Sequence, residues 1–381
     1  MLTIGRRPLP VVGRARMYVC GITPYDTTHL GHARTFVWAD VAARVLRHAG
    51  VPVEVCRNVT DVDDVLTSAA RRAGSPYDSF AAVQQFYFDR DMAALHVHPV
   101  TYEPRAHTYV PQVVALARAL LELGHAYERD GAVYFRGSGV RERAGIGAEE
   151  AARLLAEFGD DPGSGGADPR RDDPADVAIW RPSAKGEPGW PSEWGEGRPG
   201  WHAECAAMAM TTYGPALDLH AGGADLRFPH HAYEAAMAEA VTGVRPFARA
   251  WLHVGVVRVD GAKMAKSAGN LVFTTDLLRH HPVGAVRLLL LGHPWAADWD
   301  YHPGGLEEAA ARLERLHRAA YRAAYRAAYR TAAGRPAASA AGERAAVRAL
   351  LDDLDVATAL AIAEEEGGQA ARTVIAVLAL G

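Results

Sequence analysis

The alternation of short apolar runs with longer helical patterns most strongly limits what this chain can fold into. The run "MYVC", Met17 to Cys20, predicts a short strand, and residues from about Gly31 to Ala49 repeat apolar side chains on one helical face. The segment "VPVEVCRNVTDVDD" predicts a second strand, and helical patterns follow at residues 75–95 and 106–123. This order predicts an α/β fold in which a parallel sheet carries helices on both faces.

The carboxyl ends of the first two predicted strands indicate where a ligand binds. Cys20 ends the first strand, and Thr60 follows the second. In open parallel sheets, ligands bind beyond the carboxyl ends of the strands. We therefore expect both residues to lie at the functional site.

Composition narrows the class of protein. The chain has 381 residues, 49% of them hydrophobic, which is enough for more than one domain. Its 41 basic and 45 acidic residues give a net charge of −4, so no general basic field attracts nucleic acid. Three cysteines are too few for a disulfide framework, and no long apolar segment predicts export or a membrane span. We expect a cytoplasmic protein with no membrane partner, in which Cys56 is a buried core thiol.

The composition also changes along the chain and predicts five parts. The segment 159–176, "GDDPGSGGADPRRDDPAD", is rich in Gly, Pro and charge and is typical of a long flexible loop. Beyond residue 300 the pattern is helical, with Tyr321, Tyr325 and Tyr329 in a stripe that we expect to pack against neighbouring helices. The predicted parts are the first half of an α/β core (1–125), an insertion (126–199), the second half of the core (200–255), a loop and connecting region (256–304) and a helical domain (305–381).

Four residues form a candidate metal site: Cys20, Cys205, His230 and Glu234. Zinc prefers thiolate, imidazole and carboxylate ligands, and His230 and Glu234 would share one helical face because they are four residues apart. The alternative is that Cys20 and Cys205 are small buried apolar residues. Spacing alone favours this alternative, since the four residues are scattered along the chain.

Two further motifs suggest phosphate binding. In "HLGHA", His29 and His32 flank Gly31 at the predicted start of a helix, where imidazole and backbone donors stabilise phosphate charge. In "GAKMAKSAGN", Lys263 and Lys266 lie in a glycine-bounded loop that could close ammonium groups onto a triphosphate. Each motif alone also fits capping histidines or a solvated basic loop.

Taken together and in order, these motifs resemble the catalytic core of the class I aminoacyl-tRNA synthetases. "HLGH" and "KMAKS" match the two signatures of that class, and "CGITPYD", "NVTDVDD", "GWHAEC" and "FPHH" resemble its cysteine-specific branch. Within the branch, "CGITPYD" and the short tail are most similar to mycothiol-pathway ligases, which use ATP to join cysteine to the amine of glucosaminyl-inositol. The resemblance implies a Rossmann-like catalytic core with an insertion and a C-terminal helical bundle.

The resemblance also implies roles for single residues. Zinc would be held by Cys20, Cys205 and His230 and would coordinate the substrate thiol, with Glu234 or water in the fourth position. The cysteine pocket would be formed by Gly21, Thr23, Thr60 and Trp201. ATP, with Mg²⁺, would be bound by His29, Gly31, His32, Lys263, Lys266, Asn270 and Asp225, although Asp225 could read the acceptor instead of the ribose.

We therefore predict an ATP-dependent, AMP-forming ligase that activates L-cysteine as cysteinyl-adenylate. Its predicted partners are small molecules: L-cysteine, ATP and an amine acceptor such as glucosaminyl-inositol. From Tyr301 onward ten arginines balance ten acidic residues, which argues against tRNA as a partner. Three alternatives remain open: a divergent or truncated cysteinyl-tRNA synthetase, a relative that loads cysteine onto another amine or a carrier protein, and a non-catalytic protein stabilised by zinc.

Overall fold

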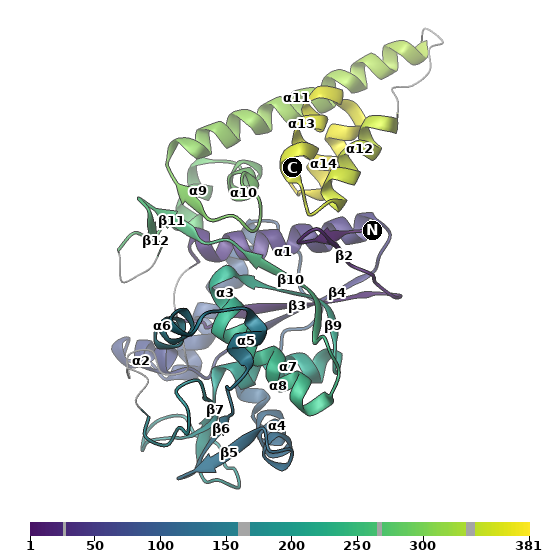
Figure 1. Ribbon diagram of the computed structural model, residues 1–381. Coiled ribbons are helices and arrows are strands. Elements are labelled where there is room, and N and C mark those ends of the chain that lie inside the picture. The colour runs from purple at the N-terminus through teal and green to yellow at the C-terminus, as the bar shows by residue number, and fades with distance from the viewer. Residues whose placement is uncertain (26–27, 159–167, 265–268, 333–339) are drawn as a thin grey trace.

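The computed structural model describes residues 1–25, 28–158, 168–264, 269–332 and 340–381, with the backbone alone for 322–332. At its centre lies a sheet of four parallel strands in the order β10-β9-β3-β4 (Figure 1). Because β4 lies on one side of β3 and β9 on the other, the strand order reverses direction at β3, which is where ligands bind in such folds. The strands are β3 (Ala15–Ile22), β4 (Val53–Val59), β9 (Leu217–Gly223) and β10 (Ala248–Val254).

Helices cover both faces of this sheet, as the sequence predicts. Helix α1 (Leu30–His48) packs on one face, and α7 (Trp201–Tyr213), with α8 (Ala232–Thr242) beside it, on the other. Alternate residues of β3 divide between these faces, since Met17 and Val19 join the core beside α1 whereas Tyr18 and Cys20 join the cluster beside α7. The prediction of a Rossmann-like α/β core is therefore confirmed, and Cys20 points toward α7.

A second, antiparallel sheet lies between the two halves of the core sequence, in the order β5-β6-β7-β8. In the loop predicted over 159–176, residues 159–167 lie outside the described part of the chain. Residues 168–176 form turns, which Tyr134 and Tyr127 fix by donating hydrogen bonds to Asp168 (2.6 Å) and Asp176 (2.7 Å). The elements here are α2 (Asp64–Arg72), α3 (Tyr77–Ala94), α4 (Val110–Glu122), β5 (Ala126–Arg129), β6 (Ala132–Phe135), α5 (Val140–Ala144), α6 (Ala148–Phe158), β7 (Val177–Pro182) and β8 (Gly197–Pro199).

The C-terminal helices form a bundle on the α1 side of the sheet (Figure 1). Arg287, which is fully buried in α10, ties this bundle to the core by donating to the carbonyl oxygens of Leu378 and Leu95 (both 2.7 Å) and pairing with Asp40 (2.9 Å). The remaining elements are β1 (Thr3–Ile4), β2 (Arg7–Pro8), β11 (Val257–Val259), β12 (Ala262–Lys263), α9 (Thr274–His280), α10 (Val283–Leu291), β13 (Trp299–Tyr301), α11 (Gly304–Ala332), α12 (Ala340–Leu351), α13 (Val356–Glu366) and α14 (Gly368–Val377).

Two sequence-based expectations concern these helices. The packing predicted for the tyrosine stripe of α11 is wrong at Tyr321, whose side chain is 78% exposed although the preceding Ala319 and Ala320 are buried. Tyr321 therefore lies on the face of α11 that points away from the bundle. The side chains of Tyr325 and Tyr329 lie outside the described residues. Within the described ranges, every helix is too short or too polar to cross a membrane.

Candidate active site

Three of the predicted metal ligands come together at the edge of the sheet. Cys20 lies near the carboxyl end of β3, Cys205 in the first turns of α7, and His230 just before α8. One ligand atom from each of these residues lies within 4.8 Å of the other two. All three side chains are buried, with exposed fractions of 5%, 1% and 1%. Residues that are 185 and 25 positions apart in the sequence thus form one compact group of two sulfurs and an imidazole.

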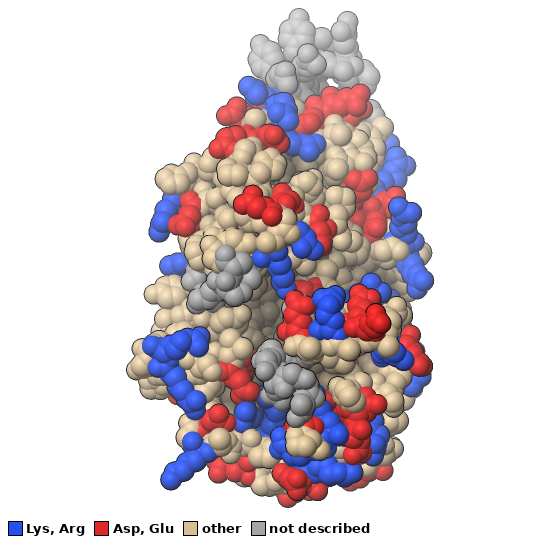
Figure 2. Space-filling view, turned by 60° about the vertical axis from the view of Figure 1, so that its left-hand side comes forward, with Lys and Arg blue, Asp and Glu red and all other residues tan. Residues whose placement is uncertain are grey.

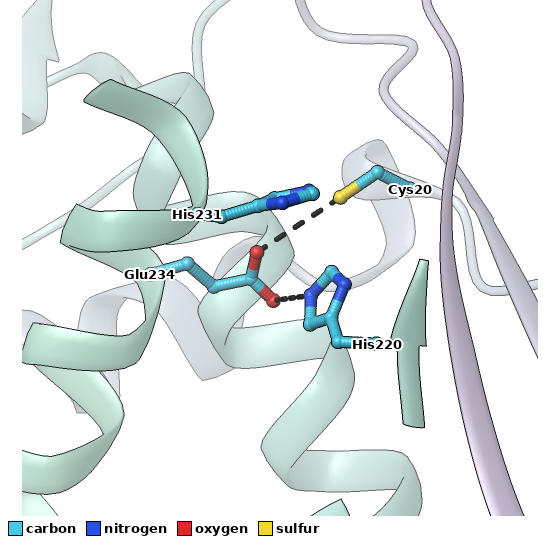
Figure 3. Close-up of side chains that lie close together, drawn as sticks. All are labelled: Cys20, His220, His231 and Glu234. Carbon is cyan, nitrogen blue, oxygen red and sulfur yellow. Dashed lines mark hydrogen bonds and ion pairs between the residues drawn. The ribbon is translucent and has the colours of Figure 1, made fainter. Parts of the chain in front are cut away.

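Glu234, the fourth predicted ligand, belongs to a second group that shares Cys20. Its carboxylate accepts a hydrogen bond from His220 Nε2 at 2.9 Å and lies 3.9 Å from Cys20 Sγ (Figure 3). With His231, these residues offer four ligand atoms within 4.8 Å of one another. The predicted set of four is thus divided between two groups that meet at Cys20.

The backbone before α8 is kinked ahead of both residues. Residues 227–231 form a π-helical turn in which Phe228 has a non-helical conformation (φ −144°, ψ 135°). His231 and Ala232 have helical backbone angles, so the kink precedes His230, and His230 and Glu234 stay one helical turn apart. Both residues accordingly lie beside Cys20, His230 in the first group and Glu234 in the second.

The chemistry of the first group fits a zinc ion. His230 Nδ1 shares a hydrogen bond with His202 Nδ1 at 2.8 Å, and His230 Nε2 is buried with no partner among the described residues. Burial lowers the pKa of His230 far below its usual range, so its imidazole is neutral and able to act as a ligand. Burial also raises the pKa of Cys20 and Cys205, so both thiols keep their protons until a metal displaces them.

Of the four residues predicted to form the cysteine pocket, Gly21 and Trp201 adjoin this group, and Thr23 and Thr60 follow the strands β3 and β4. The hydroxyls of Thr23 and Thr60 are hydrogen-bonded at 2.8 Å across the ends of β3 and β4. The Trp201 ring stacks on His230 with centroids 4.0 Å apart. Gly21 follows Cys20 directly, and a Cβ there would lie 1.7 Å from the carbonyl oxygen of Asn58. This close approach of the two strands requires glycine, whatever its role toward substrate.

The first phosphate motif caps helix α1. His29 Nδ1 accepts the backbone N–H of Gly31 at 3.1 Å, and the His29 ring stacks on His32 with centroids 3.9 Å apart. Burial, together with the nearby charges of His32 and Lys263, lowers the pKa of His29 to about 3. His29 is therefore neutral near pH 7 and can offer hydrogen bonds but no positive charge.

The second phosphate motif lies beside the first. Leu30 N–H donates to the carbonyl oxygen of Val272 at 2.9 Å, which joins the start of α1 to the segment after the lysine loop. Lys263 pairs with Asp225 at 2.8 Å, and the Asn270 amide donates to the backbone oxygen of Lys263 at 3.2 Å. Lys266 lies outside the described residues.

Sequence reasoning missed three buried residues that touch this site. His220 and His231 supply two of the four members of the second metal-binding group, and Asn58 bonds to Cys205 Sγ. The signals were present in motifs already singled out: His231 is the second histidine of "FPHH", and Asn58 precedes "VTDVDD". His220 lies on β9, the strand that neighbours β3, so its position depends on a strand order that the sequence pattern leaves open.

Comparison with known proteins identifies the family. Residues 10–311 match the family described as tRNA synthetases class I (C) catalytic domain. The chain belongs to this family. As a member of the class I (C) family it is an ATP-dependent ligase, and the enzyme class predicted from the sequence is confirmed.

Individual relatives of two kinds are similar to this class I (C) chain. An L-cysteine:1D-myo-inositol 2-amino-2-deoxy-alpha-D-glucopyranoside ligase from Acidothermus cellulolyticus is 46% identical over 78% of this chain and 74% of its own length. The corresponding ligase from Catenulispora acidiphila is 42% identical over 91% of this chain and 81% of its own length. A cysteine–tRNA ligase from Alkalilimnicola ehrlichii is 43% identical over 81% of this chain, but the match spans only 65% of that enzyme.

Solved structures confirm the fold. Methionyl-tRNA synthetase from Mycobacterium tuberculosis, bound to methionyl-adenylate, superimposes with a TM-score of 0.68 over 96% of this chain and 84% of that chain. Only 18% of the aligned residues are identical, so this likeness concerns architecture. It agrees with the parallel sheet and C-terminal helices described above.

Proposed function

We propose that this ligase activates L-cysteine with ATP and joins it to the amine of glucosaminyl-inositol, releasing pyrophosphate and AMP. The observation that carries the proposal is the buried group of Cys20, Cys205 and His230. This group lies at the carboxyl end of β3, and the first phosphate motif follows β3 in the chain. The relatives from Acidothermus and Catenulispora, whose names state this amino-sugar acceptor, support the choice of acceptor.

Recognition of cysteine is assigned to the group of Cys20, Cys205 and His230, which we call the thiol end of the site. Zinc held by Cys20, Cys205 and His230 would supply a Lewis acid there that stabilises the substrate thiolate and discriminates against the harder hydroxyl of serine. His202 fixes the ring of His230, Trp201 stacks on it, and the Thr23 and Thr60 hydroxyls offer polar contacts to the amino-acid backbone. Because Glu234 is hydrogen-bonded to His220, we assign the fourth ligand position of the zinc ion to the substrate thiol.

Activation of cysteine by ATP is assigned to the two phosphate motifs, "HLGHA" and "GAKMAKSAGN", which with Asp225 we call the phosphate end of the site. The cysteine carboxylate attacks the α-phosphorus of ATP, the bond to the leaving pyrophosphate breaks, and cysteinyl-adenylate remains. His29, which is neutral near pH 7, and His32 donate hydrogen bonds to phosphate oxygens, and Lys263 and Lys266 offset the charge that builds up on the pyrophosphate. Mg²⁺ bound with ATP would add positive charge there. Asn270 holds the backbone of Lys263, and Asp225 is its ion-pair partner before ATP arrives.

Transfer completes the reaction. The neutral amine of the acceptor attacks the carbonyl carbon of cysteinyl-adenylate, the bond to AMP breaks, and the nitrogen loses a proton as the amide forms. A small acceptor is consistent with the neutral charge of residues 301–381. It is also consistent with the face in Figure 2, on which basic and acidic side chains are interspersed rather than gathered into a basic stripe.

Cysteine tRNA is the second candidate acceptor. It is favoured by the 43% identity to the cysteine–tRNA ligase from Alkalilimnicola, although the chain spans only 65% of that enzyme. The activation chemistry is the same for both acceptors. Only the nucleophile differs, an amine in one case and a ribose hydroxyl in the other.

The experiment that tests the proposal measures cysteine-dependent AMP release and product mass with several acceptors in parallel. Glucosaminyl-inositol, other primary amines and cysteine tRNA are offered separately. A cysteine amide of the amino sugar is expected. AMP release with tRNA alone would instead assign the chain to the tRNA ligases, and no AMP with any acceptor would favour a non-catalytic protein.

A further inference from the structure

We infer that Asn58 is a positioning residue for both sulfur ligands, because one side-chain amide fixes the turn that carries Cys20 and donates a hydrogen bond to the sulfur of Cys205. The inference rests on the proposed function, in which Cys20, Cys205 and His230 hold a metal. Asn58 lies on β4 and is 1% exposed.

The first step of the argument is a bulge in β3. Val19 pairs with Arg57 and Ile22 pairs with Val59, so two residues, Cys20 and Gly21, lie opposite Asn58 alone. Bulges of this kind redirect a side chain and leave a backbone group without its partner in the ladder. Here the group is the Gly21 N–H, which donates to Asn58 Oδ1 at 2.6 Å. The Asn58 side chain thereby replaces the missing ladder bond next to Cys20.

The second step concerns the other end of the same amide. Asn58 Nδ2 lies 3.0 Å from Cys205 Sγ and donates to it. The orientation of the amide is fixed by chemistry, since only its oxygen can accept the Gly21 N–H, and its NH₂ group must then face the sulfur. Asn58 therefore joins the carboxyl end of β3 to helix α7 through two hydrogen bonds of opposite direction.

The third step is the consequence for a bound metal. A thiolate that accepts an N–H hydrogen bond holds its electrons more tightly and keeps a fixed direction toward the metal. Cys20 is held through the bulge and Cys205 is held directly, so the same amide sets the spacing of both sulfurs. Removal of such a supporting contact typically lowers metal affinity about 10- to 100-fold.

The test uses cobalt in place of zinc, because thiolate-to-cobalt charge-transfer absorption reports the electron density on the sulfurs. Asn58→Asp keeps an oxygen to accept the Gly21 N–H but has no N–H for Cys205, whereas Asn58→Ala removes both bonds. Cys56→Ala is the matched control, since Cys56 lies two residues away on β4, is fully buried, and is not among the proposed ligands. Zinc affinity is measured by competition with a chelator for all variants and for the unmodified chain.

We expect Asn58→Asp to bind zinc about 10- to 100-fold more weakly and to shift the cobalt charge-transfer band to lower energy, with Asn58→Ala affected at least as strongly and Cys56→Ala unchanged. Asn58→Ala controls for the negative charge that aspartate adds beside the sulfur. Loss of the N–H bond shifts the band in both variants, whereas added charge alone would shift it only in Asn58→Asp. An unshifted band and unchanged affinity in that variant would overturn the inference. So would loss of the fold in both Asn58 variants, which would limit the residue to the architecture. Absence of any charge-transfer band in the unmodified chain would instead refute the proposed metal site itself.

Discussion

The two ends of the candidate site differ in how completely they are built. At the thiol end, Cys20, Cys205 and His230 are at most 5% exposed and already lie within 4.8 Å of one another. At the phosphate end, the side chains of Lys263 and Asp225 are 39% and 34% exposed and form an ion pair with each other. The thiol end is thus pre-organised before any ligand binds, whereas Lys263 must leave Asp225 to reach phosphate. Selection of the amino acid is assigned to the rigid end and charge compensation to the adaptable end.

The largest expected effect comes from removing a sulfur at the thiol end. Cys205→Ala should lose tightly bound zinc and lower kcat/KM for cysteine at least about a hundredfold, since the Lewis acid contributes several kcal/mol. Elemental analysis and cysteine-dependent ATP–pyrophosphate exchange measure the two effects. Cys56→Ala, also a buried cysteine, should keep both metal and exchange. Stoichiometric zinc in Cys205→Ala would contradict the ligand assignment.

Removing a lysine at the phosphate end should separate the two regions. Lys263→Ala should lower the exchange rate about a hundredfold through lost charge stabilisation while zinc content stays full, and Lys266→Ala should behave likewise. Arg279→Ala is the control, since Arg279 is 70% exposed on nearby α9 and pairs only with Asp276 among the contacts described for it. Unchanged exchange would remove the loop from the mechanism, and lost zinc would mean that the two ends are not independent.

A smaller effect should appear in the pH dependence of stability. Burial is the main cause that lowers the pKa of His253 to about 3 and of His231 far below 6.5, so the fold keeps both imidazoles neutral. The unfolded chain takes up these protons below about pH 6.5, so the free energy of unfolding should fall on acidification by about 1–2 kcal/mol per histidine down to about pH 5. Urea unfolding at several pH values measures this slope. His253→Asn should make the slope shallower, and an unchanged slope would show that folding does not lower the pKa of His253.

The smallest expected effect concerns the hydroxyl pair at the ends of β3 and β4. Thr60→Val removes the hydrogen bond to Thr23 and should raise KM for cysteine about fivefold, corresponding to about 1 kcal/mol. Thr60→Ser keeps the hydroxyl and should retain the KM of the unmodified chain. Steady-state exchange kinetics measure both variants. An unchanged KM in Thr60→Val together with a raised KM in Thr60→Ser would show that the methyl group, rather than the hydroxyl, matters at this position.

The sequence predicts the thiol end of the site better than its surroundings. Cys20, Cys205 and His230 could be proposed as ligands because zinc chemistry limits the residue types and the family resemblance selects among them. The structure brings the three side chains together, and zinc binding stays a prediction. The contact of Glu234 with His220 could not be foreseen, because it depends on strand β9 lying beside β3, and Glu234 as a zinc ligand stays a prediction. Asn58 escaped notice because its role arises from a bulge, which is a property of strand pairing rather than of one strand.

Of the fold, the parallel sheet could be predicted from the sequence, but the order of its strands could not. Strand–helix alternation was enough to predict a parallel sheet, because each strand carries its own apolar run. The order β10-β9-β3-β4 depends instead on which strands pair across distant parts of the chain, so the proximity of His220 to Cys20 had no local signal. The exposure of Tyr321 could not be foreseen either, because a periodic stripe records one face of a helix but not whether another helix covers it.

The central claim is that the buried thiol end selects cysteine before any acceptor is present. The most direct measurement is ATP–pyrophosphate exchange by the zinc-loaded protein without an acceptor, with cysteine and serine compared at equal concentration. The account predicts exchange with cysteine and none above background with serine. Equal exchange with the two amino acids, or no exchange with cysteine from a protein that holds its zinc, would contradict it.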